Sequence, residues 1–251
     1  MGPLSVAIVC QDEEDRIEDC LESVSFADEI VVVDSGSTDR TLEIVQRYTD
    51  RVFHREWQGW KDQKKWAADR CVNEWVLTLD ADEVVSPELK ESILHVLKGP
   101  REEVDGYTFA RRTYYQGRWI KHAGWYPDKK LRLYKKSRAV FAGEDPHEVI
   151  EVSGKTGHLN GDLWHYTYRD FRHHARQLER YAAVNAEAKH KKGVRFKVSD
   201  LVLRPPFTFL KTYVLKLGFL DGLPGFVISV MNGHYTFMKY ARLRELDREK
   251  R

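Results

Sequence analysis

The sequence predicts an α/β fold whose first hundred residues form a doubly wound, mostly parallel sheet. Short apolar runs rich in β-branched residues alternate there with segments whose apolar residues have helical spacing, which is the order of strands joined by crossover helices. Two of these runs end in an aspartate, Asp34 and Asp80. Carboxylates at the ends of parallel strands lie at the sheet edge where open α/β folds bind ligands.

The alternation can be followed along the chain. Strands are expected at Leu4–Cys10, Glu29–Asp34 and Trp75–Asp80, and a short one at Arg51–His54. Helices are expected between and after them, at Glu13–Ser23, Thr41–Tyr48, Lys61–Cys71 and Pro87–Leu97. The segment Glu83–Glu88 is expected to open the last of these helices, and Gly99-Pro100 to end it.

After residue 100 the pattern changes to strands separated by turns, and then to helices. The strand-like segments are Gly106–Gln116, Leu131–Tyr134, Glu148–Val152 and Gly161–Tyr168. A long helix is expected over Phe171–Lys192 and a break at Arg204-Pro205-Pro206, followed by apolar segments at Phe207–Leu220 and Phe226–Arg244. We therefore expect an α/β domain over residues 1–170 and a helical region over residues 171–251.

The charge is distributed unevenly along the chain. Residues 1–188 carry 27 basic and 34 acidic side chains, whereas residues 189–251 carry 14 basic and 5 acidic ones. The basic C-terminal region is expected to meet an anionic partner. The three cysteines show no metal-type spacing and are too few for a disulfide framework, which fits a reducing cytoplasm. Neither a signal peptide nor an apolar run long enough to span a membrane is expected.

Asp80-Ala81-Asp82 directly follows a buried strand and is the strongest candidate for a ligand site. Two unpaired carboxylates would be costly inside the strand, but at its end they suit a hard divalent cation and phosphate oxygens. Asp34 is placed to accept hydrogen bonds from the base or ribose of a nucleotide. Ser37 and Asp39 precede the next helix and either join this crevice or cap the helix; for Ser37 the cap is preferred.

Several short motifs together resemble family-2 glycosyltransferases of the GT-A fold, which are inverting enzymes that use nucleotide-diphospho sugars. These motifs are Val6–Val9, Glu13, Asp34–Asp39, Gln63-Lys64 and Leu79–Glu83. A second set is similar to the lipopolysaccharide core β-1,4-glucosyltransferases over nearly the whole chain. It comprises Trp125–Asp128, Arg132–Tyr134, His147-Glu148, Gly161–Tyr168 and Gly218–Gly222. One departure is Asp12, where the family more often has asparagine.

The resemblance implies a donor site in the nucleotide-sugar half, residues 1–100, with UDP-glucose as the donor. Asp34 would bind the uracil or ribose side, and Asp80 the ribose or a metal. Asp82 would ligate Mg²⁺ or Mn²⁺ together with the donor diphosphate. His165 would join the metal or the diphosphate, or else be a hydrogen-bonded core histidine.

Three cations have two interpretations each. Lys61 or Lys64 would contact the base or phosphates, or lie on a solvated helix face. Arg132 would hold a phosphate of the donor or acceptor with its planar guanidinium, or pair with a structural carboxylate.

An inverting transfer needs a base for the acceptor hydroxyl and charge relief for the leaving nucleoside diphosphate. Carboxylates gather in the acceptor half, residues 101–170, at Glu144, Asp145 and Glu148. Because the His-Glu motif is the persistent one in the group that the chain resembles, Glu148 is the predicted base and Asp145 the runner-up. Glu144 is interpreted as part of a solvated turn.

The apolar segments of the C-terminal region contain interleaved Lys and Arg. They suit helices that lie in a membrane interface with their basic side near anionic head groups. The alternative is packing on the catalytic domain or on a second subunit. The first interpretation is favoured, and a lipid-linked saccharide acceptor at the cytoplasmic face of the bacterial inner membrane would give the contact a purpose.

Other functions stay open. The acceptor could be a polyprenyl phosphate or another glycan, and the chain could be a non-catalytic nucleotide-sugar or membrane-binding module. A nucleotidyltransferase is disfavoured because the segment after the first strand, Cys10–Asp15, is acidic rather than glycine-rich and basic. Nucleic acid is not expected as a partner, since no recognition motif is present and residues 1–188 are acidic.

Overall fold

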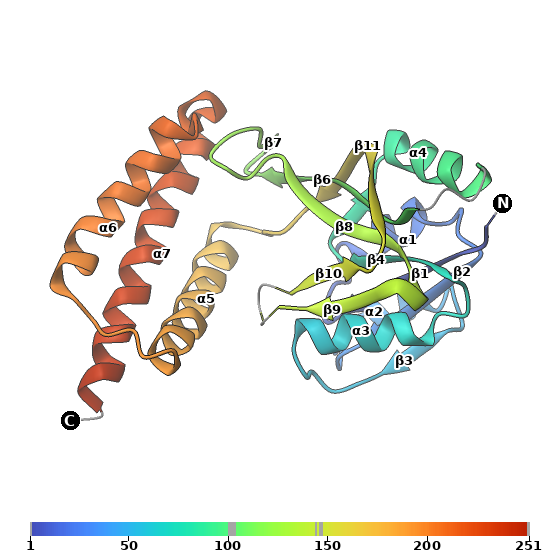
Figure 1. Ribbon diagram of the computed structural model, residues 1–251, viewed down its shortest axis with the longest axis horizontal. Coiled ribbons are helices and arrows are strands. Elements are labelled where there is room, and N and C mark those ends of the chain that lie inside the picture. The colour runs from blue at the N-terminus through green and yellow to red at the C-terminus, as the bar shows by residue number, and fades with distance from the viewer. Residues whose placement is uncertain (1, 100–103, 144, 146–147, 250–251) are drawn as a thin grey trace. The chain divides into compact units, whose positions relative to one another are not determined.

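The computed structural model describes residues 2–99, 104–143, 145 and 148–249. They form two compact units, one of Met1–Arg111 and Asp128–His165 and one of Arg112–Pro127 and Tyr166–Arg251 (Figure 1). Unlike the predicted division at residue 170, this one groups residues 112–127 with the C-terminal helices. The predictions for Pro100, Glu144 and His147 concern positions outside the described residues.

The first unit is built on a mixed sheet. Its helices are α1 (Ile17–Ser23), α2 (Thr41–Val45), α3 (Trp60–Arg70) and α4 (Pro87–Lys98), with a 3₁₀ turn η1 (Lys136–Arg138). Its strands are β1 (Leu4–Cys10), β2 (Glu29–Asp34), β3 (Val52–His54), β4 (Trp75–Asp80), β5 (Glu83–Val85), β6 (Val104–Tyr115, which continues into the second unit), β8 (Asp128–Lys135), β9 (Ala139–Ala142), β10 (Val149–Val152) and β11 (Lys155–His165).

The strand order in the sheet is β3-β2-β1-β4-β8-β6-β11-β5. The first four strands are parallel neighbours, which confirms the predicted α/β class. Strand β8 runs antiparallel to both β4 and β6, and β5 runs antiparallel to β11. Strands β9 and β10 form a separate antiparallel hairpin.

Strand β1 shows why the sheet is covered on both faces. All seven of its residues are buried, and successive side chains point to opposite faces. Val6 and Ile8 join a core with α1, α2 and α4. Ala7 and Val9 join the other core, which α3 and the β9–β10 hairpin cover. A strand buried on both faces is a continuous apolar run, and this is why the sequence identifies it.

Two boundaries in the first unit differ from the predictions. Helix α1 begins at Ile17, four residues later than predicted, and the backbone N–H groups of residues 12–14 are hydrogen-bonded to the side chains of Ser37, Thr41 and Asp39. The segment Glu83–Val85 does not open a helix but forms β5 against β11. Helix α4 begins at Pro87, with Ser86 as its N-cap: the Ser86 hydroxyl accepts from the N–H of Leu89.

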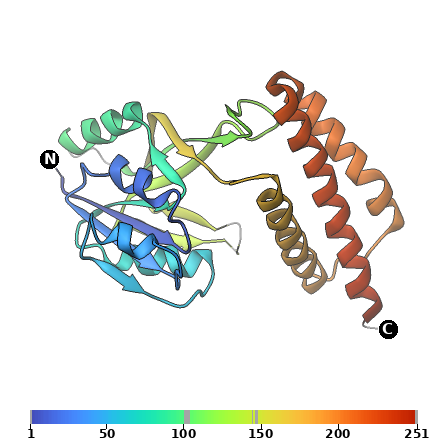
Figure 2. The ribbon, with the colours of Figure 1, turned by 180° about the vertical axis from the view of Figure 1, so that it is seen from behind.

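The second unit is helical. It contains β7 (Arg118–Trp119), which pairs with the end of β6, then α5 (Phe171–Lys191), α6 (Val198–Leu210) and α7 (Gly222–Glu249). A π-helical turn, η2 (Lys211–Leu215), and a 3₁₀ turn, η3 (Gly218–Asp221), join α6 to α7. Helix α7 lies between α5 and α6 in both views (Figures 1 and 2).

Asp221 ties η3 to the segment 112–127 and explains why that segment belongs to the second unit. The carboxylate is fully buried and accepts hydrogen bonds from the backbone N–H groups of Lys121 and His122, at 3.2 and 2.7 Å. The guanidinium of Arg118 donates to the Asp221 carbonyl at 2.9 Å.

The predicted break at Arg204-Pro205-Pro206 is wrong, because both prolines lie inside α6. A proline removes a backbone donor and normally interrupts a helix. Here α7 packs closely against this part of α6. A Cβ at Gly233 would lie 3.2 Å from the carbonyl oxygen of Pro205, so the glycine permits the approach. Tertiary packing thus keeps the segment helical.

The cores on the two faces of the sheet allow a prediction about stability. Leu77 is fully buried on β4, between β1 and β8, so Leu77→Ala is expected to lower the free energy of unfolding by ~2–5 kcal/mol. Urea unfolding followed by circular dichroism measures the change. Val72→Ala is the matched control, since Val72 is 66% exposed and its truncation is expected to cost less than ~0.5 kcal/mol. Equal effects of the two substitutions would contradict the described core.

Candidate active site

The two strand-end aspartates flank the end of one strand. Asp34 ends β2 and is the register partner of Cys10 on β1, while Asp80 ends β4 and is the partner of Val9. Both carboxylates therefore lie at the carboxyl edge of the parallel strands, as the sequence predicts.

Lys64 joins this edge to the predicted base. It lies on α3 with only 2% of its side chain exposed, and its Nζ is 2.8 Å from Asp80 Oδ1 and 2.8 Å from Glu148 Oε1. A buried ammonium is tolerated only where carboxylates pair with it. The solvated-face interpretation of Lys64 is therefore wrong. Because both carboxylates pair with the same ammonium, Glu148 lies close to Asp80.

A chain of alternating charges continues from Asp80. Its Oδ2 is 3.0 Å from Arg132 Nη2, which in turn lies 3.5 Å from Glu83 Oε1. Arg111 reaches the same Glu83 oxygen at 3.1 Å and Asp128 at 2.8 Å. Glu83 is fully buried, and its second oxygen accepts the backbone N–H of Asp80. Arg132 thus pairs with structural carboxylates, as one of its two interpretations predicts.

Arg111 and the role of Glu83 were not predicted from the sequence. Arg111 is the register partner of Asp128 across β6 and β8, and that pairing cannot be read from a local pattern. Glu83 stands in the predicted Leu79–Glu83 motif, but its buried position follows from the unexpected strand β5.

The charges around Asp80 set its ionisation. Burial alone would raise the pKa of the Asp80 carboxyl, but the nearby Lys64 and Arg132 outweigh burial and hold this pKa well below its usual range. Burial opposes the charged form of Arg132 as well, and there the carboxylates of Glu83 and Asp80 raise the guanidinium pKa. Asp80 and Arg132 therefore favour each other's charged form.

Asp82 and His165 form a second pair at this edge. Asp82 Oδ2 lies 3.3 Å from His165 Nε2, and the imidazole outweighs burial and lowers the pKa of the Asp82 carboxyl. His165 Nδ1 is buried, and none of the described residues is placed to hydrogen-bond it. The alternative of a core histidine with satisfied hydrogen bonds therefore does not fit.

The predicted metal ligands are only partly brought together. Asp82 and His165 face each other, whereas the Asp80 oxygens are engaged by Lys64 and Arg132. Among the described residues, no group of three or more His, Cys, Asp or Glu side chains is placed to hold a metal ion. Asp82 and His165 do offer one oxygen and one nitrogen on a shared edge, which fits a cation whose other ligands come from a diphosphate.

Asp145, the runner-up base, caps a helix in the structure. Its Oδ1 accepts the backbone N–H of Lys61 at 3.0 Å, in the first turn of α3. Gly59, with φ of +109°, makes room for it: a Cβ at Gly59 would lie 2.1 Å from Asp145 Oδ2. The Lys61 side chain reaches the carbonyl of Gly143 at 3.4 Å.

Asp34, Ser37 and Asp39 shape the β2–α2 loop. The Asp34 carboxylate is buried and accepts the N–H groups of Gly36 and Ser37 as well as the Ser37 hydroxyl. The preferred cap role of Ser37 is wrong, because Ser37 Oγ accepts the N–H of Asp12 instead. Asp39 accepts the N–H and hydroxyl of Thr41, bonds that outweigh burial and lower its pKa.

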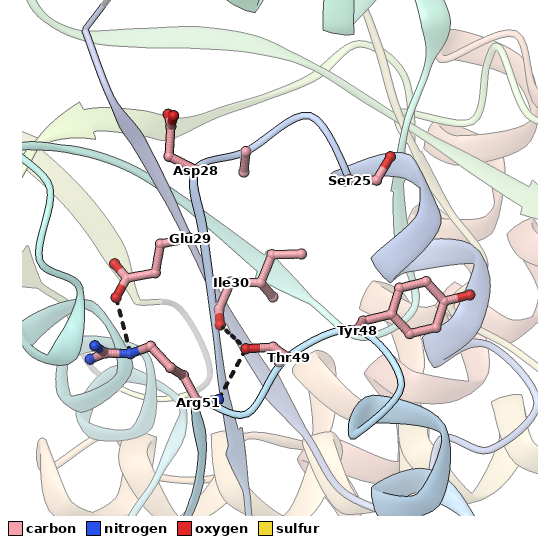
Figure 3. A pocket seen from close by; sticks show the side chains of 8 residues that line it. Ser25, Asp28, Glu29, Ile30, Tyr48, Thr49 and Arg51 are labelled. Carbon is pink, nitrogen blue, oxygen red and sulfur yellow. Dashed lines mark hydrogen bonds and ion pairs between the residues drawn. The ribbon is translucent and has the colours of Figure 1, made fainter.

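A pocket of about 330 Å³ lies elsewhere (Figure 3). It is at the amino end of β2, where Glu29 begins the strand that Asp34 ends. Arg51 Nε pairs with Glu29 at 3.0 Å, and the Thr49 hydroxyl donates to the Ile30 carbonyl, so its polar groups engage one another. None of the predicted site residues lines it.

The ionised state of Asp80 makes a pH prediction. Asp80→Asn leaves Lys64 and Arg132 without their shared carboxylate and is expected to lower stability at pH 7 by ~3–5 kcal/mol. A carboxyl whose pKa is lowered by folding stabilises the fold above its unfolded pKa of about 3.9, and this contribution is lost as the pH falls through the folded pKa. The gap between wild type and variant should therefore shrink below about pH 4.

Urea unfolding at a series of pH values measures this gap. Asp69→Asn is the control, since Asp69 forms an exposed pair with Lys65 and should show a small difference at every pH. A wild-type-to-variant gap that stays constant down to pH 2 would show that Asp80 is not held ionised by the cluster.

Comparison with known proteins places the chain among glycosyltransferases. The sequence profile of Glycosyl transferase family 2 matches residues 5–152. The chain is 31% identical to the lipopolysaccharide core biosynthesis glycosyltransferase LpsC of Rhizobium meliloti over 248 residues, which cover 96% of this chain and 92% of LpsC. It is 30% identical to the uncharacterised glycosyltransferase RT0209 of Rickettsia typhi, covering 100% of this chain and 90% of that protein.

Among solved structures, residues 1–349 of TarS from S. aureus match with a TM-score of 0.49 and 17% identity, over 99% of this chain and 92% of that one. The relationship itself is shown by the sequence, since the profile covers more than half of the chain and the match to LpsC nearly all of it. The predicted resemblance is thus confirmed, and the chain belongs to glycosyltransferase family 2.

Proposed function

We propose that this glycosyltransferase moves a hexose, glucose, from a UDP-sugar to a lipid-linked saccharide with inversion at the anomeric carbon. The observation that carries the proposal is the buried ion pair between Lys64 and both Asp80 and Glu148. It brings the strand-end carboxylates, where a nucleotide sugar would bind, next to a carboxylate that can take a proton from an acceptor.

Glu148 is proposed as the general base. One of its oxygens is held by Lys64, which fixes the side chain and leaves the second oxygen for an acceptor hydroxyl. The side chain is 13% exposed, so it is accessible from one side and ordered on the other. The proton of the acceptor hydroxyl passes to Glu148. At the same time the hydroxyl oxygen attacks the anomeric carbon from the side opposite the leaving nucleoside diphosphate. Asp145 serves a different purpose, because it caps α3.

Asp82 and His165 are proposed to hold Mg²⁺ or Mn²⁺ together with the donor diphosphate. A bound divalent ion supplies charge relief for the leaving nucleoside diphosphate. Asp80 is proposed to orient the ribose rather than to ligate the metal, since Lys64 and Arg132 already engage it. The cationic members of the cluster also balance the phosphate charge that a donor brings.

The β2–α2 loop is proposed to bind the nucleoside. Asp34 orders this loop through Gly36 and Ser37, and Asp39 anchors it to residue 14 by accepting that residue's N–H at 3.1 Å. A loop cross-linked in this way offers preformed backbone groups to a uracil and its ribose. Lys61, in the first turn of α3, is proposed to lie near the phosphates.

The acceptor is proposed to be the lipopolysaccharide inner core or a similar lipid-linked saccharide. Support comes from LpsC, which is named for lipopolysaccharide core biosynthesis and which the chain matches along nearly its full length. We accordingly propose that the protein works at the cytoplasmic face of the bacterial inner membrane, on an anionic membrane surface. The basic excess of residues 189–251 supports this location.

The donor proposal is tested by ligand-induced stabilisation. UDP-glucose with Mn²⁺ or Mg²⁺ is expected to raise the melting temperature, since a ligand at about a hundred times its Kd adds ~2.7 kcal/mol of stability. The screen compares UDP, GDP, CDP and their sugars, each with and without metal. Asp82→Asn is expected to lose the part of the rise in melting temperature that depends on the metal. Asp69→Asn is the control. If no nucleotide stabilises the protein, the proposed donor site is wrong.

The assignment of the base makes a separate prediction. Glu148→Gln is expected to lower kcat by ~10²–10⁴-fold with little change in donor affinity, because the amide cannot take the acceptor proton. Asp145→Asn keeps an oxygen that accepts the Lys61 N–H and should retain most of the activity. Steady-state rates and calorimetric donor binding distinguish the two. The opposite ranking of the two variants would make Asp145 the base.

A further inference from the structure

Exposed apolar side chains are concentrated in one part of the second unit. Of the twenty large hydrophobic residues that are exposed among those described, fourteen lie between residues 198 and 237. They are Val198, Val202, Leu203, Phe207, Leu210, Val214, Leu215, Leu217, Phe219, Leu220, Leu223, Phe226, Val230 and Phe237. Scattered exposed apolar residues need no explanation, but a contiguous set of this size marks an interaction surface.

The set follows the geometry of the two helices that carry it. Val198 and Val202 are four residues apart on α6, and so are Leu203 and Phe207, so each pair lies on the same side of the helix. No described residue of α6 is buried, although the helix packs along α7. Helix α6 lies on the side of α7 opposite α5, and its exposed apolar side chains are not covered within this unit (Figures 1 and 2).

The turn between α6 and α7 is the most apolar part. We call residues 210–226 the apolar corner; it holds eight of the fourteen side chains. Its irregular backbone is well hydrogen-bonded. The Lys216 N–H donates to the Lys211 carbonyl, the Leu220 N–H donates to the Leu217 carbonyl, and the Lys216 carbonyl accepts the N–H of Ala123. Backbone groups satisfied in this way can enter an apolar medium at low cost.

The exposed charge of this region has one sign. Between residues 201 and 244 the only acidic residue is Asp221, which is fully buried. Lys211 and Lys216 remain in the apolar corner, and their long side chains can bury the stem while the ammonium reaches a polar layer. Arg195, Lys197 and Arg204 lie near the start of α6, where Arg195 pairs with Asp247 and Arg204 pairs with Asp200. The region thus pairs an apolar tip with a cationic flank.

We propose that the apolar corner inserts into one leaflet of an anionic lipid bilayer, with residues 215–223 deepest and the start of α6 at the level of the head groups. The insertion itself does not depend on the proposed function, but its biological purpose does. An inserted corner would keep the enzyme at the membrane surface that carries its acceptor. Insertion of ~5–10 Å is typical of such interfacial elements.

The hydropathy of α6 and α7 fits the insertion of a bent helix pair. In the described part of the chain, no individual helix has the length and hydropathy to cross a membrane, while Val198–Leu215 and Gly218–Arg248 reach that threshold as a bent pair. A second copy of the chain is the other candidate for this surface. It is disfavoured because a two-fold contact would place two surfaces of the same positive charge against each other.

Vesicle binding tests the proposal with the full-length protein, without donor or acceptor. The wild type is expected to sediment with vesicles of phosphatidylethanolamine and phosphatidylglycerol more strongly than with phosphatidylcholine vesicles. Substituting the two most exposed corner residues, Leu215→Gln and Leu223→Gln, is expected to weaken binding at least ~10-fold. The matched control is Val72→Gln with Val140→Gln, which removes two similarly exposed apolar side chains elsewhere and should change nothing.

Fluorescent labelling of introduced cysteines measures how deeply the apolar corner inserts into the bilayer. The native cysteines are buried, and burial raises the pKa of Cys71 to about 12, so an exposed new cysteine is labelled selectively. A fluorophore on Leu220→Cys is expected to be quenched by deep lipid quenchers, and one on Val198→Cys only by shallow ones. Equal depths would overturn insertion through the corner.

The remaining outcomes are also decisive. If the double substitution Leu215→Gln and Leu223→Gln leaves vesicle binding unchanged, the proposal is overturned. If the same pair converts a dimer into a monomer in analytical ultracentrifugation, the surface is a subunit interface instead. Because UDP-glucose stabilisation is measured separately, loss of vesicle binding with a normal donor response separates failure of this inference from failure of the proposed function.

Discussion

The Lys64 ammonium, buried between the carboxylates of Asp80 and Glu148, is the interaction on which the candidate site depends. An ion in a poorly hydrated environment must keep its partners at short range, since each of them is costly to leave unpaired. Lys64 comes from α3, Asp80 from β4, and Glu148 from the loop directly before β10. Three separate parts of the first unit are therefore held in register by one side chain.

The same constraint spreads outwards through Arg132, Glu83 and Arg111. Each added cation meets a carboxylate that another cation already engages, so the cluster alternates in sign and shares its desolvation cost among several bonds. Asp82 and His165 stand apart from this chain. The separation gives two neighbouring aspartates different environments. Asp80 is held in a network of ion pairs, whereas Asp82 faces a single imidazole whose other nitrogen has no hydrogen-bond partner among the described residues.

The parallel strands and the two strand-end aspartates could be predicted because a strand buried on both faces leaves a continuous apolar run that stops at a polar residue. The pairing of Lys64 could not, since a lysine on a short amphipathic helix looks the same whether it is solvated or buried. Arg111 needed the β6–β8 register, which is set by antiparallel strands far apart in sequence. The two prolines in α6 led to a wrong prediction of a helix break, because packing against α7 overrides their local preference.

The loop that precedes β10 is attached twice to the same helix. Asp145 accepts the N–H of Lys61 and Glu148 pairs with the side chain of Lys64, so three steps along the loop are matched to three steps along α3. An insertion or deletion between Asp145 and Glu148 would break one of these two attachments, and it would move the Glu148 carboxylate away from the Lys64 ammonium.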